Sequence, residues 1–370
     1  MWRTMGKATA GTEARLVEQL LAVVPGDIDA FRALCSSVPD WARAIDCARE
    51  QGVLAVLLHY VRDANVEIPG SLLQAARRHC TIEQLWTSQV ASALAEALPR
   101  LNAEGIKGVA LKGPVLAERL YPDAALRPCI DLDLLVDAGQ LEAANTVLEA
   151  LGYRGQTGPG ADYARAYEHH VHFERPNTPT VELHFRLYAG FGTALGARDA
   201  LDRATIVRTA AGAPVGVLAP EDEVLYLALH ATGHSYVRLL WLYDLKLMLR
   251  QFANLDWALV ADRAQRSGVL SAVAFTCEVL RDRLGVPAPS ASQLGMSPGM
   301  RWRFARRLLP TVMKPTARSA WENLESLVFT SLLCDRWSAG FRLVRHHAMR
   351  GLKRRVHRVA PVLVPEDWSA

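Results

Sequence analysis

Two aspartates interrupt an otherwise apolar run at residues 130–136, which reads Ile-Asp-Leu-Asp-Leu-Leu-Val. The run predicts a buried strand, and side chains two positions apart on a strand point to the same face. We therefore expect Asp131 and Asp133 to converge on one point of a sheet. Carboxylates that lose hydration side by side need a cation or hydrogen-bond donors as partners. Oxygen ligands of this kind favour Mg²⁺ or Mn²⁺ over Zn²⁺, so the run predicts a metal site.

A second alternating segment, residues 180–188, lies about fifty positions further on. Its apolar and polar residues alternate as in a half-buried strand, which places Glu182, His184 and Arg186 on one face. If this strand pairs beside the aspartate strand, Glu182 supplies a third carboxylate. Three carboxylates are enough to hold two metal ions in a phosphoryl-transfer site.

Lys112 and Gly113 stand between a predicted strand at 106–111 and a predicted helix at 114–120. Backbone N–H groups and the helix dipole at such a turn attract phosphate, and glycine allows a ligand to approach the backbone closely. We therefore expect Lys112 and Gly113 to contact a triphosphate, although Lys112 could also be an ordinary surface lysine. Arg127 has two interpretations, because arginine suits phosphates and carboxylates equally. It either neutralises the triphosphate or braces the loop by pairing with an acid.

Histidines precede and follow the Glu182 position. The run 169–174 is predicted to form a hairpin with the next strand through a turn at 176–179, and it places His170 and His172 on one strand face. With His184 they raise the alternative of a zinc site, which is disfavoured because no cysteine is near and the carboxylates already account for a metal. A supporting or acceptor-binding role fits His172 and His184 better.

The order of these motifs resembles the bacterial nucleotidyltransferase family of the polymerase-beta-like superfamily, over roughly residues 105–244. Residues 229–234 and 238–244 resemble the His-rich helix and the Leu-x-Trp-x-x-Asp segment of that family. The wider superfamily places Gly-Ser in the first turn, whereas this chain has Lys-Gly-Pro, so a serine contact to the phosphates is not expected. His230 and His234 are four apart on the predicted helix, which is typical of a packed helix interface.

The resemblance implies an enzyme that moves a nucleoside monophosphate from a nucleoside triphosphate, with ATP as first choice, to a hydroxyl or phosphate and releases pyrophosphate. Two Mg²⁺ ions, replaceable by Mn²⁺, are implied at Asp131, Asp133 and Glu182. Related proteins occur beside biosynthetic genes, which favours a small-molecule or peptide acceptor. Three alternatives stay open: a nucleotidyltransferase that acts on tRNA or other RNA, a kinase-like phosphoryl transfer on the same residues, and a non-catalytic nucleotide-binding protein.

The spacing of apolar residues predicts an α/β core with a small sheet between helical regions. The resemblance implies the α+β class, with the small mixed-sheet core of polymerase-beta-like nucleotidyltransferases flanked by N-terminal and C-terminal helical regions. The N-terminal helical region is expected at 1–100, the core at 101–218 and a C-terminal helical domain at 219–370. Within the core, a helix at 139–151 and a hairpin at 206–218 complete the pattern. The six cysteines are scattered without the paired spacing of a zinc or redox site.

The C-terminal region is strongly basic, because residues 301–358 hold 14 Lys or Arg against three acidic residues. Its last part, 342–358, predicts an amphipathic basic helix that could bind RNA, an anionic membrane or an acidic partner. Packing of its apolar side onto the helical domain is the simpler interpretation. The sequence contains neither a membrane-spanning run nor the apolar core of a secretion signal, so we expect a cytoplasmic location.

Overall fold

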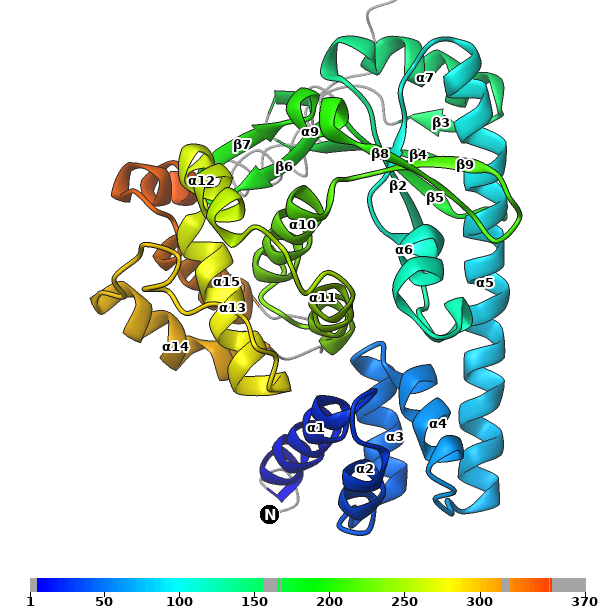
Figure 1. Cartoon of the computed structure of the whole chain (residues 1–370), viewed down its shortest axis with the longest axis vertical. Helices are drawn as coiled ribbons and strands as arrows, with labels where there is room; N and C mark the ends of the chain where they lie inside the picture. The colour runs from blue at the N-terminus through cyan, green and yellow to red at the C-terminus, as the bar shows by residue number, and fades with distance from the viewer. Residues whose placement is uncertain (1–4, 156–164, 167, 314–319, 346, 348–370) are drawn as a thin grey trace, which may run out of the picture.

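The computed structural model describes residues 5–155, 165–166, 168–313, 320–345 and 347. Five helices precede the first strand, as the sequence predicts: α1 (Met5–Val23), α2 (Ile28–Cys35), α3 (Trp41–Glu50), α4 (Leu54–Asp63) and α5 (Gly70–Ala103). The carboxylates of Asp27 and Asp40 accept hydrogen bonds from the first backbone N–H groups of α2 and α3. The long helix α5 runs from the other N-terminal helices to the sheet (Figure 1), so it fixes the N-terminal region to the core.

A seven-stranded mixed sheet forms the core, in the order β3-β4-β5-β2-β1-β9-β8. Its strands are β1 (Val109–Ala110), β2 (Asp131–Leu135), β3 (Arg154–Gly155), β4 (His170–Glu174), β5 (Thr180–His184), β8 (Thr205–Arg208) and β9 (Pro214–Val217). The pairs β2/β5 and β1/β9 are parallel, and the other neighbours are antiparallel. The aspartate strand therefore lies directly beside the glutamate strand, which is the condition under which Glu182 supplies a third carboxylate.

The two faces of the sheet differ in chemistry. Leu132, Leu134, Val181 and Leu183 belong to one buried cluster together with residues of α5 and of α7 (Leu141–Ala150). Because side chains alternate along a strand, Asp133 and its neighbours two positions away point to the opposite face. That face is approached by α6 (Gly113–Leu120) and by α10 (Pro220–Gly233), as Figure 1 shows.

The remaining elements flank the sheet. They are the short 3-10 helices η1 (Ala124–Leu126) and η2 (Ala138–Gln140), the strands β6 (Arg186–Gly190) and β7 (Thr193–Gly196), and the helices α9 (Arg198–Arg203), α11 (Leu239–Gln251), α12 (Trp257–Ser267), α13 (Leu270–Leu284), α14 (Met300–Val312) and α15 (Ala320–Leu332). One large apolar cluster joins the N-terminal helices to α10, α11 and α13. The predicted α+β class, a mixed sheet between helical regions, is confirmed.

Two predicted strands differ from the structure. The strand expected at 106–111 is only two residues long, and the strand expected at 180–188 ends at His184. Arg186 begins β6, which pairs with β7 in a separate sheet, so it does not share the face of Glu182. The N–H groups of Phe185 and Arg186 both donate to the carbonyl of His169, where the neighbouring strand β4 has not yet begun. Among the described residues, the pairing of β4 with β5 ends at this point, and the chain continues into β6.

Most of the predicted basic segment 342–358 lies outside the described residues. Within them, Arg342 donates two hydrogen bonds to the carbonyl of Gly192 in the β6–β7 hairpin. In the described part of the chain, every helix is too short or too polar to cross a membrane.

Candidate active site

A row of ionisable side chains crosses three neighbouring strands on the polar face of the sheet. The register pairs Asp133 of β2 with Glu182 of β5, and Glu182 with His172 of β4. The next row pairs His170 of β4 with His184 of β5. Paired residues point to the same face, so the row results from the strand register and not from local sequence.

Asp133 lies at the centre of this row and is 2% exposed. Its Oδ1 is 3.0 Å from Nζ of Lys112 and 3.2 Å from Nε2 of His184. Its Oδ2 is buried and has no hydrogen-bond partner among the described residues. Burial by itself would raise the pKa of Asp133, but Lys112 and His184 hold that pKa well below its usual range. Asp133 is therefore a charged carboxylate with one oxygen available to a cation.

Lys112 and Gly113 form the turn that enters α6, as predicted. Gly113 has a φ of +73°, a conformation that favours glycine, and a Cβ at this position would meet no atom within 4 Å. The turn is thus open in front of its backbone. Burial opposes the charge of Lys112, but the attraction of Asp133 prevails and raises the pKa of the lysine. The ammonium group therefore neutralises Asp133 in this structure, a contact that the phosphate prediction did not include.

The two aspartates of β2 have different surroundings. Asp133, Glu182 and His184 each offer a ligand atom within 4.8 Å of the others, whereas Asp131 is in none of the three-residue groups of this kind in the described chain. The register pairs Asp131 with Thr180, two positions before the glutamate row, and leaves it half-buried at the start of β2. Burial and the neighbouring Asp133 raise the pKa of Asp131 to about 6. That Asp131 and Asp133 serve one metal site stays a prediction.

The donor set fits a divalent cation. A buried carboxylate oxygen without a hydrogen bond is costly, and a metal ion would satisfy it. Asp133 and Glu182 supply oxygen ligands, and Asp131 lies on the same face of β2. These carboxylates are the residues that would hold Mg²⁺ or Mn²⁺.

Arg127 adopts the bracing arrangement. Its Nε and one terminal nitrogen each bond to an oxygen of Asp244 at 2.8 Å, and the Tyr121 hydroxyl donates to the same carboxylate at 2.6 Å. Arg127 is 3% exposed and Asp244 is fully buried. This pair fastens the loop before β2 to α11 and so helps to position the aspartate strand. A triphosphate contact of Arg127 stays a prediction.

Helix α10 contributes a residue that sequence reasoning missed. Tyr226 is buried, its ring centre lies 6.4 Å from that of His184, and its hydroxyl has no hydrogen-bond partner among the described residues. It stands within an apolar stretch of α10, where no local sequence signal marks it. His230 and His234, on the same helix, both pack against the Trp241 ring, at 4.9 and 5.1 Å between ring centres. They form the predicted helix interface.

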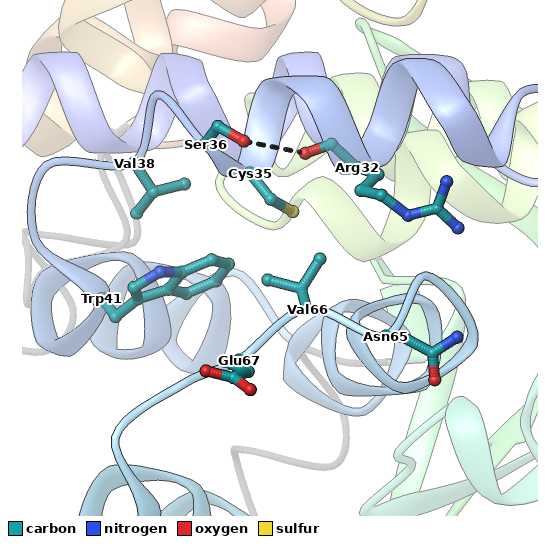
Figure 2. A pocket seen from close by; sticks show the side chains of 8 residues that line it. All are labelled: Arg32, Cys35, Ser36, Val38, Trp41, Asn65, Val66 and Glu67. Atoms are coloured by element: carbon teal, nitrogen blue, oxygen red, sulfur yellow. Dashed lines mark hydrogen bonds between the residues drawn. The ribbon is translucent and has the colours of Figure 1, made fainter.

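A hollow of about 400 Å³ lies elsewhere, in the N-terminal helical region. Figure 2 shows Trp41 and Val66 on one side of the hollow and Arg32, Cys35 and Ser36 on the other. The Ser36 hydroxyl donates a hydrogen bond to the Arg32 carbonyl. The eight lining residues lie within 32–41 and 65–67, in α2, at the start of α3 and in the loops that follow α2 and α4. None of them comes from the sheet. The hollow is therefore separate from the carboxylate row.

Comparison with known proteins gives one family. The family model described as uncharacterised nucleotidyltransferase matches residues 37–285, which is more than half of the chain. The antibiotic-resistance factor ANT(2'')-Ia, solved in solution, is similar at 15% identity, with 49% of this chain and 94% of that chain covered and a TM-score of 0.35. An antigenic nucleotidyltransferase-like protein from Paracoccidioides brasiliensis is similar at 14% identity, with 55% and 96% covered and a TM-score of 0.32. No curated protein sequence gave a significant match.

Proposed function

Because the chain belongs to the uncharacterised nucleotidyltransferase family, we propose that it transfers a nucleoside monophosphate from a nucleoside triphosphate to an acceptor hydroxyl or phosphate. ATP is the proposed donor, a small molecule or peptide the proposed acceptor, and pyrophosphate the leaving group. One observation carries the proposal: the buried Asp133, with an unpartnered oxygen, lies beside Glu182 and next to an open Lys-Gly turn.

Each residue has a proposed task in this reaction. The acceptor oxygen attacks the α-phosphorus, the bond from that phosphorus to the bridging oxygen breaks, and pyrophosphate leaves. Asp131, Asp133 and Glu182 are proposed to hold two Mg²⁺ ions, which when bound would acidify the acceptor oxygen and neutralise phosphate charge. Glu182, 19% exposed at its side chain, is proposed to accept the proton that the acceptor loses. Lys112 and the Gly113 backbone are proposed to bind the departing pyrophosphate.

Lys112 therefore has two partners at different stages. In the described structure it pairs with Asp133, and a bound cation and triphosphate would release it to the phosphates. Lys112→Met is expected to lower kcat/KM by about 10- to 100-fold, because a charge-assisted hydrogen bond contributes about 1.5–3 kcal/mol. Mg²⁺ affinity, measured by calorimetry, is expected to rise, since the competing ammonium group is gone.

Lys107→Met is the matched control for this prediction. The Lys107 ammonium donates to the carbonyl of Leu201, away from the carboxylate row, so its loss should leave kcat/KM unchanged. Equal kinetics in Lys112→Met and the parent enzyme would contradict the phosphate role of the turn.

The position of the label in the product tests the proposed reaction. The purified chain is incubated with Mg²⁺ and with ATP labelled at either the α or the γ phosphate, against pooled small molecules, peptides and tRNA. We expect label from the α phosphate in a product, together with an equal amount of pyrophosphate. Transfer of the γ label instead would show phosphoryl transfer, and labelled tRNA alone would move the acceptor to RNA.

Glu182→Gln provides the matched test of the site in this assay. The amide keeps the shape of the side chain but removes its charge and basicity, so transfer of the α label should fall by about 100-fold or more. Glu174→Gln, the same change at an exposed position two strand rows away on β4, should have little effect. Equal loss in both variants would show a general effect on the sheet instead of a catalytic one.

A further inference from the structure

Strand β4 brings two histidines to the carboxylate row that the proposed reaction does not require. Nε2 of His170 lies 3.2 Å from Nε2 of His172, and Nδ1 of His172 lies 3.7 Å from an oxygen of Glu182. These three residues each offer a ligand atom within 4.8 Å of the others. They come from two antiparallel strands whose register pairs His172 with Glu182, so the backbone holds the group together.

The two Nε2 atoms, which are within hydrogen-bond distance in this structure, are also as far apart as two nitrogens that share one metal ion. Two nitrogens bound to one tetrahedral Zn²⁺ at about 2.0–2.1 Å lie about 3.3 Å apart. Two histidines and a glutamate, with a fourth position left open, are a known ligand set for zinc and need no cysteine. The lack of cysteine, which disfavours zinc on sequence grounds, therefore does not exclude it here.

Accessibility selects this group over its neighbours. His170, His172 and Glu182 are all half-buried, whereas the other two groups include His184, which is 1% exposed and already bonded to Asp133. An ion from solvent reaches the half-buried group first. Imidazole ligands also discriminate between metals, because borderline ions such as Zn²⁺ bind them far better than Mg²⁺ does.

We propose that His170, His172 and Glu182 form a binding site for a borderline divalent cation such as Zn²⁺, and that an ion bound there inhibits the enzyme by engaging Glu182. The inhibitory half rests on the proposed function, which assigns Glu182 to the Mg²⁺ ions and to the acceptor proton. The binding half rests only on the geometry of the three side chains. A site of this kind would make transfer sensitive to the ratio of zinc to magnesium.

Metal binding is tested first, without reference to activity. The full chain is stripped of metal and titrated with Zn²⁺ in excess Mg²⁺ against a chromophoric chelator, and Co²⁺ is used to record the visible absorption of a tetrahedral site. We expect one tight ion per chain. His170→Ala and His172→Gln should each weaken it by at least about tenfold, since even supporting residues of metal sites contribute that much. His79→Ala, whose imidazole pairs with Glu83 on α5, is the matched control.

Thermal denaturation of both histidine variants establishes that they are folded, and the two different substitutions guard against a local packing effect. Zinc binding that is equal in the parent chain, His170→Ala and His172→Gln would overturn the site. Inhibition is then measured relative to the zinc-free rate of each variant, and the zinc concentration that halves the rate should rise in both. Tight binding without inhibition would overturn the regulatory half. Failure to detect any transfer, with zinc binding intact, would instead count against the proposed function.

Discussion

Asp133→Asn should eliminate measurable nucleotidyl transfer and also lower the free energy of unfolding. The substitution removes the charge that holds a cation, a contribution of several kcal/mol to the transition state, so the rate should fall at least about 100-fold. It also leaves the buried Lys112 without its carboxylate partner at 3.0 Å. Removing one member of a buried ion pair costs about 3–5 kcal/mol. Kinetics and thermal denaturation of the same preparation measure both effects.

Asp131→Asn separates the loss of activity from the loss of stability. The Asp131 side chain is half-buried, and burial and the neighbouring Asp133 raise its pKa. This variant should keep or exceed the stability of the parent chain in the absence of metal, since it relieves repulsion, and should still lose activity. Asp137→Asn, the same change after the end of β2 at a cap that bonds to Gly139 and Arg198, is the control. Full turnover in Asp131→Asn and in a folded preparation of Asp133→Asn would refute the carboxylate site.

The sequence indicated which face of each carboxylate strand is buried, whereas the pairing of the two strands entered only as a condition of the three-carboxylate hypothesis. The alternation of apolar and charged residues in 130–136 and 180–184 fixes which side of each strand is buried. Each strand has one apolar face that must be buried. In the structure, helices α5 and α7 pack against that face. The order of the motifs then carried the resemblance, and the resemblance supplied the expected chemistry.

The direction of the charged side chains could not be read from the sequence. Lys112 turns to Asp133, and Arg127 to Asp244, which lies 117 positions away. The sequence shows where a Lys or Arg lies but not which carboxylate it pairs with, because only the tertiary fold brings the two side chains together. The same reason applies to His172, whose contact with Glu182 depends on the register of the β4–β5 hairpin. The length of a turn sets such a register.

Arg127→Met is expected to destabilise the chain by about 3–5 kcal/mol, because it leaves the fully buried carboxylate of Asp244 with the Tyr121 hydroxyl and without a counter-charge. The apolar replacement fills much of the space of the arginine stem, so the loss reflects charge and hydrogen bonding more than a cavity. Denaturant unfolding measures the free energy. Arg198→Met, which breaks the exposed pair with Asp137, should leave the free energy of unfolding nearly unchanged, because solvent screens an exposed ion pair.

The double variant Arg127→Met/Asp244→Leu distinguishes bracing from nucleotide binding. Removing both charges leaves no unpaired ion, and buried ion pairs replaced by apolar residues often lose little stability. The double variant should therefore recover most of what either single change costs, and the coupling between the two positions should reach about 1–3 kcal/mol. A nucleotide contact predicts a different outcome. Arg127→Met would then have the stability of the parent chain but a higher KM for ATP. Asp244→Leu alone would keep the KM of the parent chain, and the double variant would have the same KM as Arg127→Met. That result would return Arg127 to the triphosphate and leave the buried contact with Asp244 without an energetic role.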